Sequence, residues 1–190
     1  VVKLIKSERI FPKEIEEVPF DSILQKYTGA AVIFGTTGGV MEAALRTAAY
    51  VVTSKNPEPN AFDSLHTAEI TKEKPWRDSI ISLPIGDVSV AVVNGLGNAR
   101  KLCEALLRKE VKYDFVEVMA CPGGCVGGGG QPINCEDIEM AGTRSKILHN
   151  LDSNMPIRYS HENQDVKELY NDLLQAPLSH KSEELLHVNH

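Results

Sequence analysis

The residues with the clearest chemical potential are two cysteines, Cys121 and Cys125, in a loop that is rich in glycine. Six of the 14 glycines of the chain fall between Gly123 and Gly130, directly after an apolar run, which is not typical of a flexible linker. Thiolates are soft ligands for metals, and glycine lets the backbone pass close to a bulky group. Nearby backbone N–H groups can also donate hydrogen bonds to cluster sulfides. The loop therefore predicts a metal or cluster site.

Three kinds of site can be built on such a loop. A phosphate-binding loop is disfavoured, because the GxxxxGK[ST] pattern is missing and no Lys or Arg lies nearby. A zinc site accepts the spacing of Cys121 and Cys125, but the chain offers no second well-placed ligand pair. An iron–sulfur cluster accepts the same spacing. The residues favour metal over a structural thiol pair, although a free cysteine is most often a small buried hydrophobe.

A cubane iron–sulfur cluster usually needs four thiolates, and the chain has four cysteines. Cys103 is predicted to lie on a helix face with Leu102 and Leu106, so we expect a core thiol there rather than a ligand. Cys135 follows the glycine-rich loop, and we expect it at the periphery, away from Cys121. If neither residue is a ligand, two cluster ligands must come from sequence outside this chain.

Composition and charge narrow the class of protein. A chain of 190 residues with 42% hydrophobic and 24% charged residues is typical of one globular domain. Its net charge of -6 argues against nucleic acid as a partner. No apolar run predicts a membrane span, and the cysteines are too few for a secreted disulfide scaffold. We expect a cytoplasmic protein, and the start in mid-helix suggests a fragment or a split subunit.

The elements that position the cysteine loop follow from hydrophobic periodicity. Apolar runs predict four strands, at residues 30–34, 79–83, 88–93 and 113–119. The second and third of these strands are predicted to form a hairpin. Periodic segments predict helices over 1–9, 20–27, 38–53, 99–108, 136–150, 164–175 and 179–188. Strands that alternate with helices indicate an α/β domain, with helices packed on a sheet of about four strands.

Several blocks of the chain resemble the [FeFe], or iron-only, hydrogenases. Residues 117–132 resemble the third cysteine signature of that family almost residue for residue, and residues 34–48 and 95–102 match two further blocks. Residues 156–163 and 177–181 resemble the usual family C-terminus. The resemblance spans nearly the whole chain, in order, so the domain that it implies covers residues 1–190. It implies the C-terminal lobe of a two-lobed catalytic domain of the large subunit.

The resemblance also implies a cofactor, the H-cluster. In this family a [4Fe–4S] cubane is joined through one cysteine sulfur to a two-iron unit that carries CO, cyanide and a bridging dithiolate. Cys121 resembles the cysteine that binds only the cubane, and Cys125 resembles the bridging cysteine at the catalytic centre. Phe34, Val40 and Met119 fall where the family places apolar side chains around the two-iron unit. Ordinary core packing is the alternative for these three residues.

Other family features are missing from this chain. The Thr-Ser-Cys-Cys-Pro and Met-Pro-Cys-Thr-Ala-Lys-Lys signatures do not occur in it. The residues that these signatures would supply are therefore also missing: two cubane ligands, the cysteine that relays protons, and the lysine that contacts a cyanide. The resemblance therefore implies partners: the N-terminal half of the catalytic domain, and ferredoxin or NAD(P)-linked electron-transfer subunits. The parent would interconvert H2 with protons and electrons under anaerobic conditions, and this chain alone should be inactive.

Two rival functions share part of the pattern. Hydrogenase-like iron–sulfur assembly factors have the Cys-Pro-x-Gly-Cys loop without hydrogenase activity, but they tend to depart from the Gly-Gly-Val-Met-Glu-Ala block that residues 38–43 keep. A H2-sensing hydrogenase-like protein is the second rival. For the main interpretation, Phe34 and Met119 should end two parallel strands whose following loops meet at one sheet edge. That apolar face, with Val40 and both cysteines, should be covered by the missing half.

Overall fold

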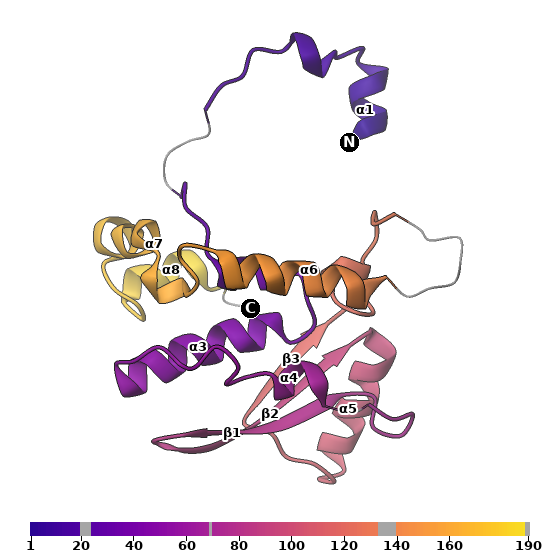
Figure 1. Ribbon diagram of the computed structural model, residues 1–190, viewed down its shortest axis with the longest axis vertical. Helices are drawn as coiled ribbons and strands as arrows, with labels where there is room; N and C mark the ends of the chain where they lie inside the picture. The colour runs from indigo at the N-terminus through magenta and orange to yellow at the C-terminus, as the bar shows by residue number, and fades with distance from the viewer. Residues whose placement is uncertain (20–23, 69, 133–139, 189–190) are drawn as a thin grey trace.

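The computed structural model describes residues 1–19, 24–68, 70–132 and 140–188. Within them a sheet of three strands has helices on both faces (Figure 1). Strand β1 (Arg77–Leu83) pairs antiparallel with β2 (Gly86–Asn94), and β2 pairs parallel with β3 (Phe115–Met119). The α/β class is therefore confirmed, with three strands in the described residues where about four were expected.

The predicted hairpin is present. Leu83 lies opposite Gly86 in the register, so Pro84 and Ile85 form a two-residue turn. Gly86 has a φ of 128°, a conformation that glycine adopts at little cost. Both strands extend slightly beyond the expected apolar runs, because β-pairing continues through polar edge residues.

The strand predicted over 30–34 is wrong: this segment forms the short helix α2 (Gly29–Ile33). Thr28 caps it, since its hydroxyl oxygen accepts a hydrogen bond from the N–H of Ala31 at 3.2 Å. A five-residue apolar run has no periodicity that separates helix from strand. Phe34 therefore follows a helix, and the expected pair of parallel strands ending at Phe34 and Met119 does not exist.

The remaining helices fit the predicted pattern more closely. Helix α3 (Gly39–Thr53) confirms the long helix expected after Gly38, and α5 (Leu96–Leu107) and α6 (Ala141–Asn154) are present with shifted ends. Shorter helices are α1 (Val2–Ser7), α4 (Ser64–Thr67), α7 (Gln164–Leu169), a π-helix (Tyr170–Leu174) and α8 (His180–Leu186). Of the helix expected over 20–27, residues 20–23 lie outside the described residues and 24–27 are not helical.

Strand β2 divides the hydrophobic core into two layers. Val90 and Val92 pack toward α3 and α4, whereas Ala91 and Val93 pack toward α5. This alternation follows the two-residue period of a strand that is covered on both faces. The first layer is completed by Met41, Leu45, Ala49, Phe62, Leu65 and Ile81, and the second by Trp76, Leu102 and Ala105.

Helix α6 lies across α2 and α3 on the side of α3 away from the sheet (Figure 1). Residues 1–19, which include α1, form an arm that extends away from this body (Figure 1). The arm carries exposed apolar side chains, among them Val2 and Leu4. None of the helices in the described part of the chain has the length and apolar character needed to span a membrane.

Candidate functional site

The cysteine loop leaves β3 as a series of tight turns. The carbonyl of Met119 accepts a hydrogen bond from the N–H of Gly95 at 2.8 Å, which joins the start of the loop to the start of α5. The N–H of Gly124 then donates to the carbonyl of Cys121 at 3.1 Å, and the N–H of Gly128 donates to that of Cys125 at 3.0 Å. A short 3₁₀ helix, η2 (Cys125–Gly127), therefore begins at the second cysteine.

This loop packs directly on the turn that follows α2. The N–H of Val126 donates to the carbonyl of Gly35 at 3.0 Å. Gly124 has a φ of 89°, and a Cβ atom there would lie 2.8 Å from the backbone nitrogen of Thr37. Both its conformation and this close contact require glycine. The backbones next to Phe34 and next to Cys125 are therefore in direct contact.

A buried carboxylate holds the same two segments together. Glu117 on β3 is 7% exposed, and its Oε1 and Oε2 atoms accept hydrogen bonds from the N–H groups of Gly38 and Met41, both at 2.7 Å. These N–H groups belong to the first turn of α3, which has no partners for them within the helix. A negative charge is also favourable at this end of a helix. Glu117 thus fixes the start of α3 relative to β3.

The structure brings together the segments that carry the predicted site residues, although not by the expected strand geometry. Cys125 is exposed and Cys121 is half-buried. Phe34 is 46% exposed, and Val40 and Met119 are half-buried. These exposures fit a surface whose cover lies outside the described residues. The role of each residue at a cofactor stays a prediction.

The surroundings of Cys121 fit a bulky group bound at its sulfur. A Cβ atom at Gly128 would lie 3.3 Å from the Sγ atom of Cys121, and one at Gly129 would meet nothing within 4 Å. Glycine backbone, without side chains, therefore lies beside the thiol. Thiolate sulfur and close backbone are what an iron–sulfur cluster requires. The described residues thus fit the cluster, with two of its four thiolates.

Of the two other cysteines, only Cys103 lies among the described residues. Cys103 is exposed, so the expectation of a core thiol is wrong. Helix α5 buries Leu102 and Ala105 against β2, and its periodicity turns Cys103 toward solvent. Cys135, which we expected at the periphery, lies outside the described residues.

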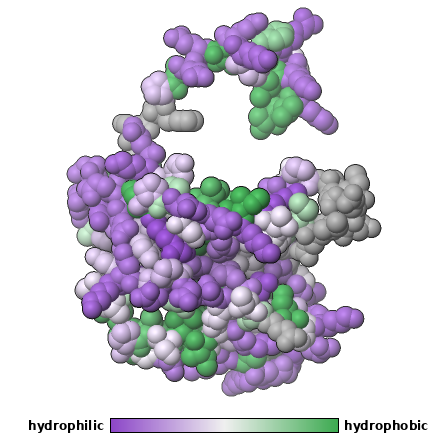
Figure 2. All heavy atoms as spheres, in the orientation of Figure 1, coloured by the Kyte–Doolittle hydropathy of each residue, from purple (hydrophilic) through white to green (hydrophobic). Residues whose placement is uncertain are grey.

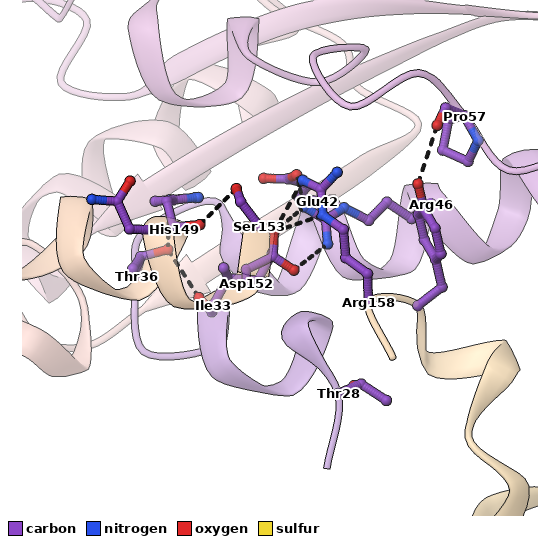
Figure 3. A network of polar contacts seen from close by, with 12 residues as sticks. Thr28, Ile33, Thr36, Glu42, Arg46, Pro57, His149, Asp152, Ser153 and Arg158 are labelled. Atoms are coloured by element: carbon purple, nitrogen blue, oxygen red, sulfur yellow. Dashed lines mark hydrogen bonds and ion pairs between the residues drawn. The ribbon is translucent and has the colours of Figure 1, made fainter. Parts of the chain in front are cut away.

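A second polar cluster, between α3 and α6, escaped the sequence analysis. Arg46 donates to both oxygens of Asp152, at 2.8 and 2.7 Å, and also to Glu42 Oε1 at 2.5 Å (Figure 3). Arg158 donates to Asp152 Oδ2 at 3.0 and 3.1 Å. Burial raises the pKa of Asp152, but the hydrogen bonds from Arg46 and Arg158 lower it more. The pKa of this carboxyl group therefore lies below its ordinary value.

Two histidines extend this cluster. The Nε2 atom of His66 lies 2.6 Å from Glu42 Oε2, and the rings of His66 and His149 meet edge to face at 4.6 Å. Burial raises the pKa of Glu42, but the His66 hydrogen bond and the Arg46 charge lower it more. Burial and the neighbouring His66 lower the pKa of His149. Only the spacing of Glu42 and Arg46 on one helix face could have signalled this cluster from the sequence.

Comparison with known proteins places the whole chain in one group. Residues 1–129 match the family model described as iron only hydrogenase large subunit, C-terminal domain, and residues 138–190 match that of the iron hydrogenase small subunit. The NADP-reducing hydrogenase subunit HndD of Solidesulfovibrio fructosivorans is 40% identical over all of this chain and 32% of its own length. This chain therefore spans about a third of that relative.

The fold and the rival function are also represented among known proteins. A structure of the [FeFe]-hydrogenase HydA1 from Chlamydomonas reinhardtii aligns with a TM-score of 0.69 and 35% identity, over 99% of this chain and 53% of its own. The cytosolic iron–sulfur assembly component 3 of Mus musculus is 29% identical over all of this chain and 39% of its own length. The chain is thus similar in structure to a hydrogenase and in sequence to both hydrogenases and an assembly factor.

Proposed function

The chain belongs to the iron-only hydrogenase large-subunit family, and on that premise we propose that it is one lobe of a catalytic domain that interconverts H2 with protons and electrons. One observation carries the proposal. The loop with Cys121 and Cys125 is seated by backbone contacts on the turn after Phe34, with glycine backbone beside the Cys121 thiol. A loop of this kind is suited to hold a large sulfide cluster rather than a small ion.

Each site residue has a stated role in this proposal. Cys121 would hold the [4Fe–4S] cubane, and Cys125 would be the cysteine shared by the cubane and the two-iron unit with its CO, cyanide and dithiolate ligands. Phe34, Val40 and Met119 would form an apolar wall beside the two-iron unit. When bound, the cofactor would supply one-electron storage and an open iron site for H2. The residues of this chain position the cofactor and exclude water from it.

The supporting residues set the rigidity of the site. Glu117 fixes the first turn of α3, and so the position of Val40, against the strand that leads to Cys121. Gly124 allows the loop to lie against Thr37 without a gap. A site whose ligands come from a short loop needs such support, because small displacements of a ligand change its bonding to the metal.

The proposal requires a partner that covers the cysteine loop and supplies the missing thiolates. We infer that this partner is the other half of the catalytic domain. Apolar side chains are exposed on the arm and on α6, and Figure 2 shows both as green patches on one face. They include Val1, Val2, Leu4, Ile147 and Leu151, with exposures of 50% or more. Patches of this kind mark surfaces that bind a partner.

Electrons would be exchanged with ferredoxin or, through partner subunits, with NAD(P)H. The name of the relative HndD, an NADP-reducing hydrogenase subunit, supports the second route. Thiolates kept free for iron fit a reducing cytoplasm, which is our proposed compartment. An iron–sulfur assembly role is the second candidate function, since the mouse cytosolic iron–sulfur assembly component 3 is similar in sequence over all of this chain. Residues 38–43 keep Gly-Gly-Val-Met-Glu-Ala, which favours a hydrogenase over an assembly factor. A H2-sensing protein shares this block, so the block does not separate sensing from catalysis.

The test uses the chain as part of a complete catalytic domain that evolves H2. Cys121→Ser and Cys125→Ser should each abolish H2 evolution and lower the iron content, because a hydroxyl is a poor ligand for iron in this setting. Cys103→Ala is the matched control and should leave both unchanged, since its thiol is exposed on α5. Equal iron loss in Cys103→Ala would show that the ligand assignment is wrong. Iron binding without any H2 evolution in the unmodified domain would favour the assembly role.

A further inference from the structure

We propose that Glu42, His66 and His149 form a second metal site, separate from the cysteine loop, for a divalent cation such as Zn²⁺. The three side chains come from α3, α4 and α6, which are far apart in the sequence. One ligand atom from each lies within 4.8 Å of the others. Two imidazoles and one carboxylate are a common ligand set for zinc sites that keep one coordination position open.

The carboxylate of Glu42 is already oriented for this role. Its Oε1 atom accepts a hydrogen bond from Arg46, and its Oε2 atom faces His66 Nε2 at 2.6 Å. In the proposed site, a metal ion takes the place of the hydrogen atom between Glu42 Oε2 and His66 Nε2. With metal–ligand bonds of about 2.0–2.1 Å, tetrahedral ligand atoms stand about 3.3 Å apart. The His66 side chain, which is 21% exposed, has room to shift by that difference.

The charges around the three ligands permit a cation. Arg46 lies beside Glu42, but it also makes two hydrogen bonds to the buried carboxylate of Asp152. Arg158 and Asp152 add one further charge of each sign, so the two arginines and two carboxylates together are neutral. The charges of Arg46 and Arg158 are therefore compensated, while the adjoining pocket is also lined by the cationic Arg77 and Lys146 and the anionic Asp63.

An open pocket next to the three residues gives a ligand access to the ion. The pocket has a volume of about 740 Å³ and is lined by Glu42, His66 and His149 as well as by Thr37. Thr37 is 8% exposed, and its Oγ1 atom has no hydrogen-bond partner among the described residues. The next residue, Gly38, packs on the His66 ring: a Cβ atom there would lie 3.1 Å from His66 Cε1. Thr37 thus brings a buried hydroxyl without a described partner to the lining of this pocket.

The site would connect three helices, α3, α4 and α6. Helix α4 is only four residues long, and its His66 would be tied through the metal to α3 and α6. Binding energy of a metal that only the folded state can hold adds to the stability of that state. We therefore expect an ion that stabilises the domain and presents one open coordination position to the pocket.

The experiment measures Zn²⁺ binding to the full 190-residue chain by calorimetry. All four cysteines are first replaced by serine, so that thiolates do not compete for the ion. We expect one Zn²⁺ per chain, and an affinity at least about 100-fold weaker in His66→Gln and in His149→Gln, because loss of even an outer-shell partner costs 10–100-fold. His180→Gln is the control, since His180 is exposed on α8, and it should bind as the parent does. No stoichiometric binding, or unchanged binding in His149→Gln, overturns the proposal.

A second measurement needs no substitution in the site. One equivalent of Zn²⁺ should shift the ring nitrogen resonances of His66 and His149 in the NMR spectrum and leave those of His180 in place. Shifts at His180 alone, or no shift at His66 and His149, contradict the site even if zinc binds elsewhere. Because the test uses a chain without cysteines, its outcome is independent of the hydrogenase proposal.

Discussion

The Oε1 atom of Glu117 accepts a hydrogen bond from the backbone N–H of Gly38 at 2.7 Å, although the two residues lie 79 positions apart. Glu117 stands two residues before the end of β3, and Gly38 immediately precedes α3. This contact therefore connects the strand that delivers Cys121 with the helix that carries Val40. It adds to the direct contacts that hold the cysteine loop on the turn after Phe34.

Removal of this carboxylate should destabilise the whole domain. We expect Glu117→Ala to lower the free energy of unfolding by about 2–4 kcal/mol, because two buried N–H groups lose a charged acceptor. Urea unfolding of the 190-residue chain measures this value. Glu110→Ala is the control, since its carboxylate pairs with Arg108 on the surface, and it should cost much less than Glu117→Ala. Equal losses in the two variants would contradict the capping role.

The contact between the cysteine loop and the turn at Thr37 should not tolerate a side chain. Gly124→Ala introduces a Cβ atom 2.8 Å from the Thr37 backbone nitrogen at a φ of 89°. We expect a loss of about 1–3 kcal/mol of stability from strain and displacement. Gly129→Ala should be neutral, because a Cβ atom there meets nothing within 4 Å. Thermal unfolding of both variants measures this difference in stability. A Gly124→Ala variant as stable as the parent would show that the loop does not pack as described.

The buried cluster around Asp152 should make stability depend on acid pH. The pKa of Asp152 is lowered from 3.8, so its contribution is present above that value and is lost as the pH falls below it. We expect Asp152→Asn to cost about 3–5 kcal/mol at pH 7, because buried Arg46 loses its partner. The variant should also depend less on pH below 3.8, measured by urea unfolding. Asp172→Asn, on the surface, is the control, and a variant that keeps the parent's pH profile would rule out this assignment.

The raised pKa of Tyr113 predicts that the stability of the protein falls at alkaline pH. Burial raises its pKa to about 12; Asp78 adds to this effect, while the hydrogen bond from Trp76 opposes it. Since the folded pKa exceeds the ordinary value of 10.0, the stabilising contribution is complete below pH 10.0 and is lost as the pH rises toward 12. Ultraviolet titration should show one of the five tyrosines ionising late, and Tyr113→Phe should remove that step. Five equivalent tyrosines would refute the prediction.

Sequence patterns correctly predicted those helices and strands whose signal lies within one short segment of the chain. The hairpin turn at Pro84 and Ile85 and the long stripe of α3 could be read from periodicity and turn chemistry. The apolar run at α2 is too short to show a period, and only Thr28, as a capping residue, indicated a helix. The same reasoning failed for Cys103, because neighbouring Leu102 defines the buried face of α5.

The candidate site was predictable only in part. The types and spacing of Cys121 and Cys125 indicated cluster chemistry, and the resemblance assigned their roles. That resemblance did not show that Glu117 caps α3. His66 and His149 come from segments without local signals, and only the tertiary packing of α4 and α6 brings them to Glu42. Contacts between distant segments depend on the whole fold, which periodicity does not describe.

The most direct test of the central claim is the iron content of the chain with and without its proposed other half. Both preparations are reconstituted anaerobically with iron and sulfide, and iron and acid-labile sulfide are counted per chain. We predict about four iron atoms per chain, in a cubane, only when the half with the missing cysteine signatures is present. Stoichiometric binding should then be lost in Cys121→Ser and kept in Cys103→Ala. A complete cluster on the 190-residue chain alone would contradict the account, because its ligands would then all lie within this chain.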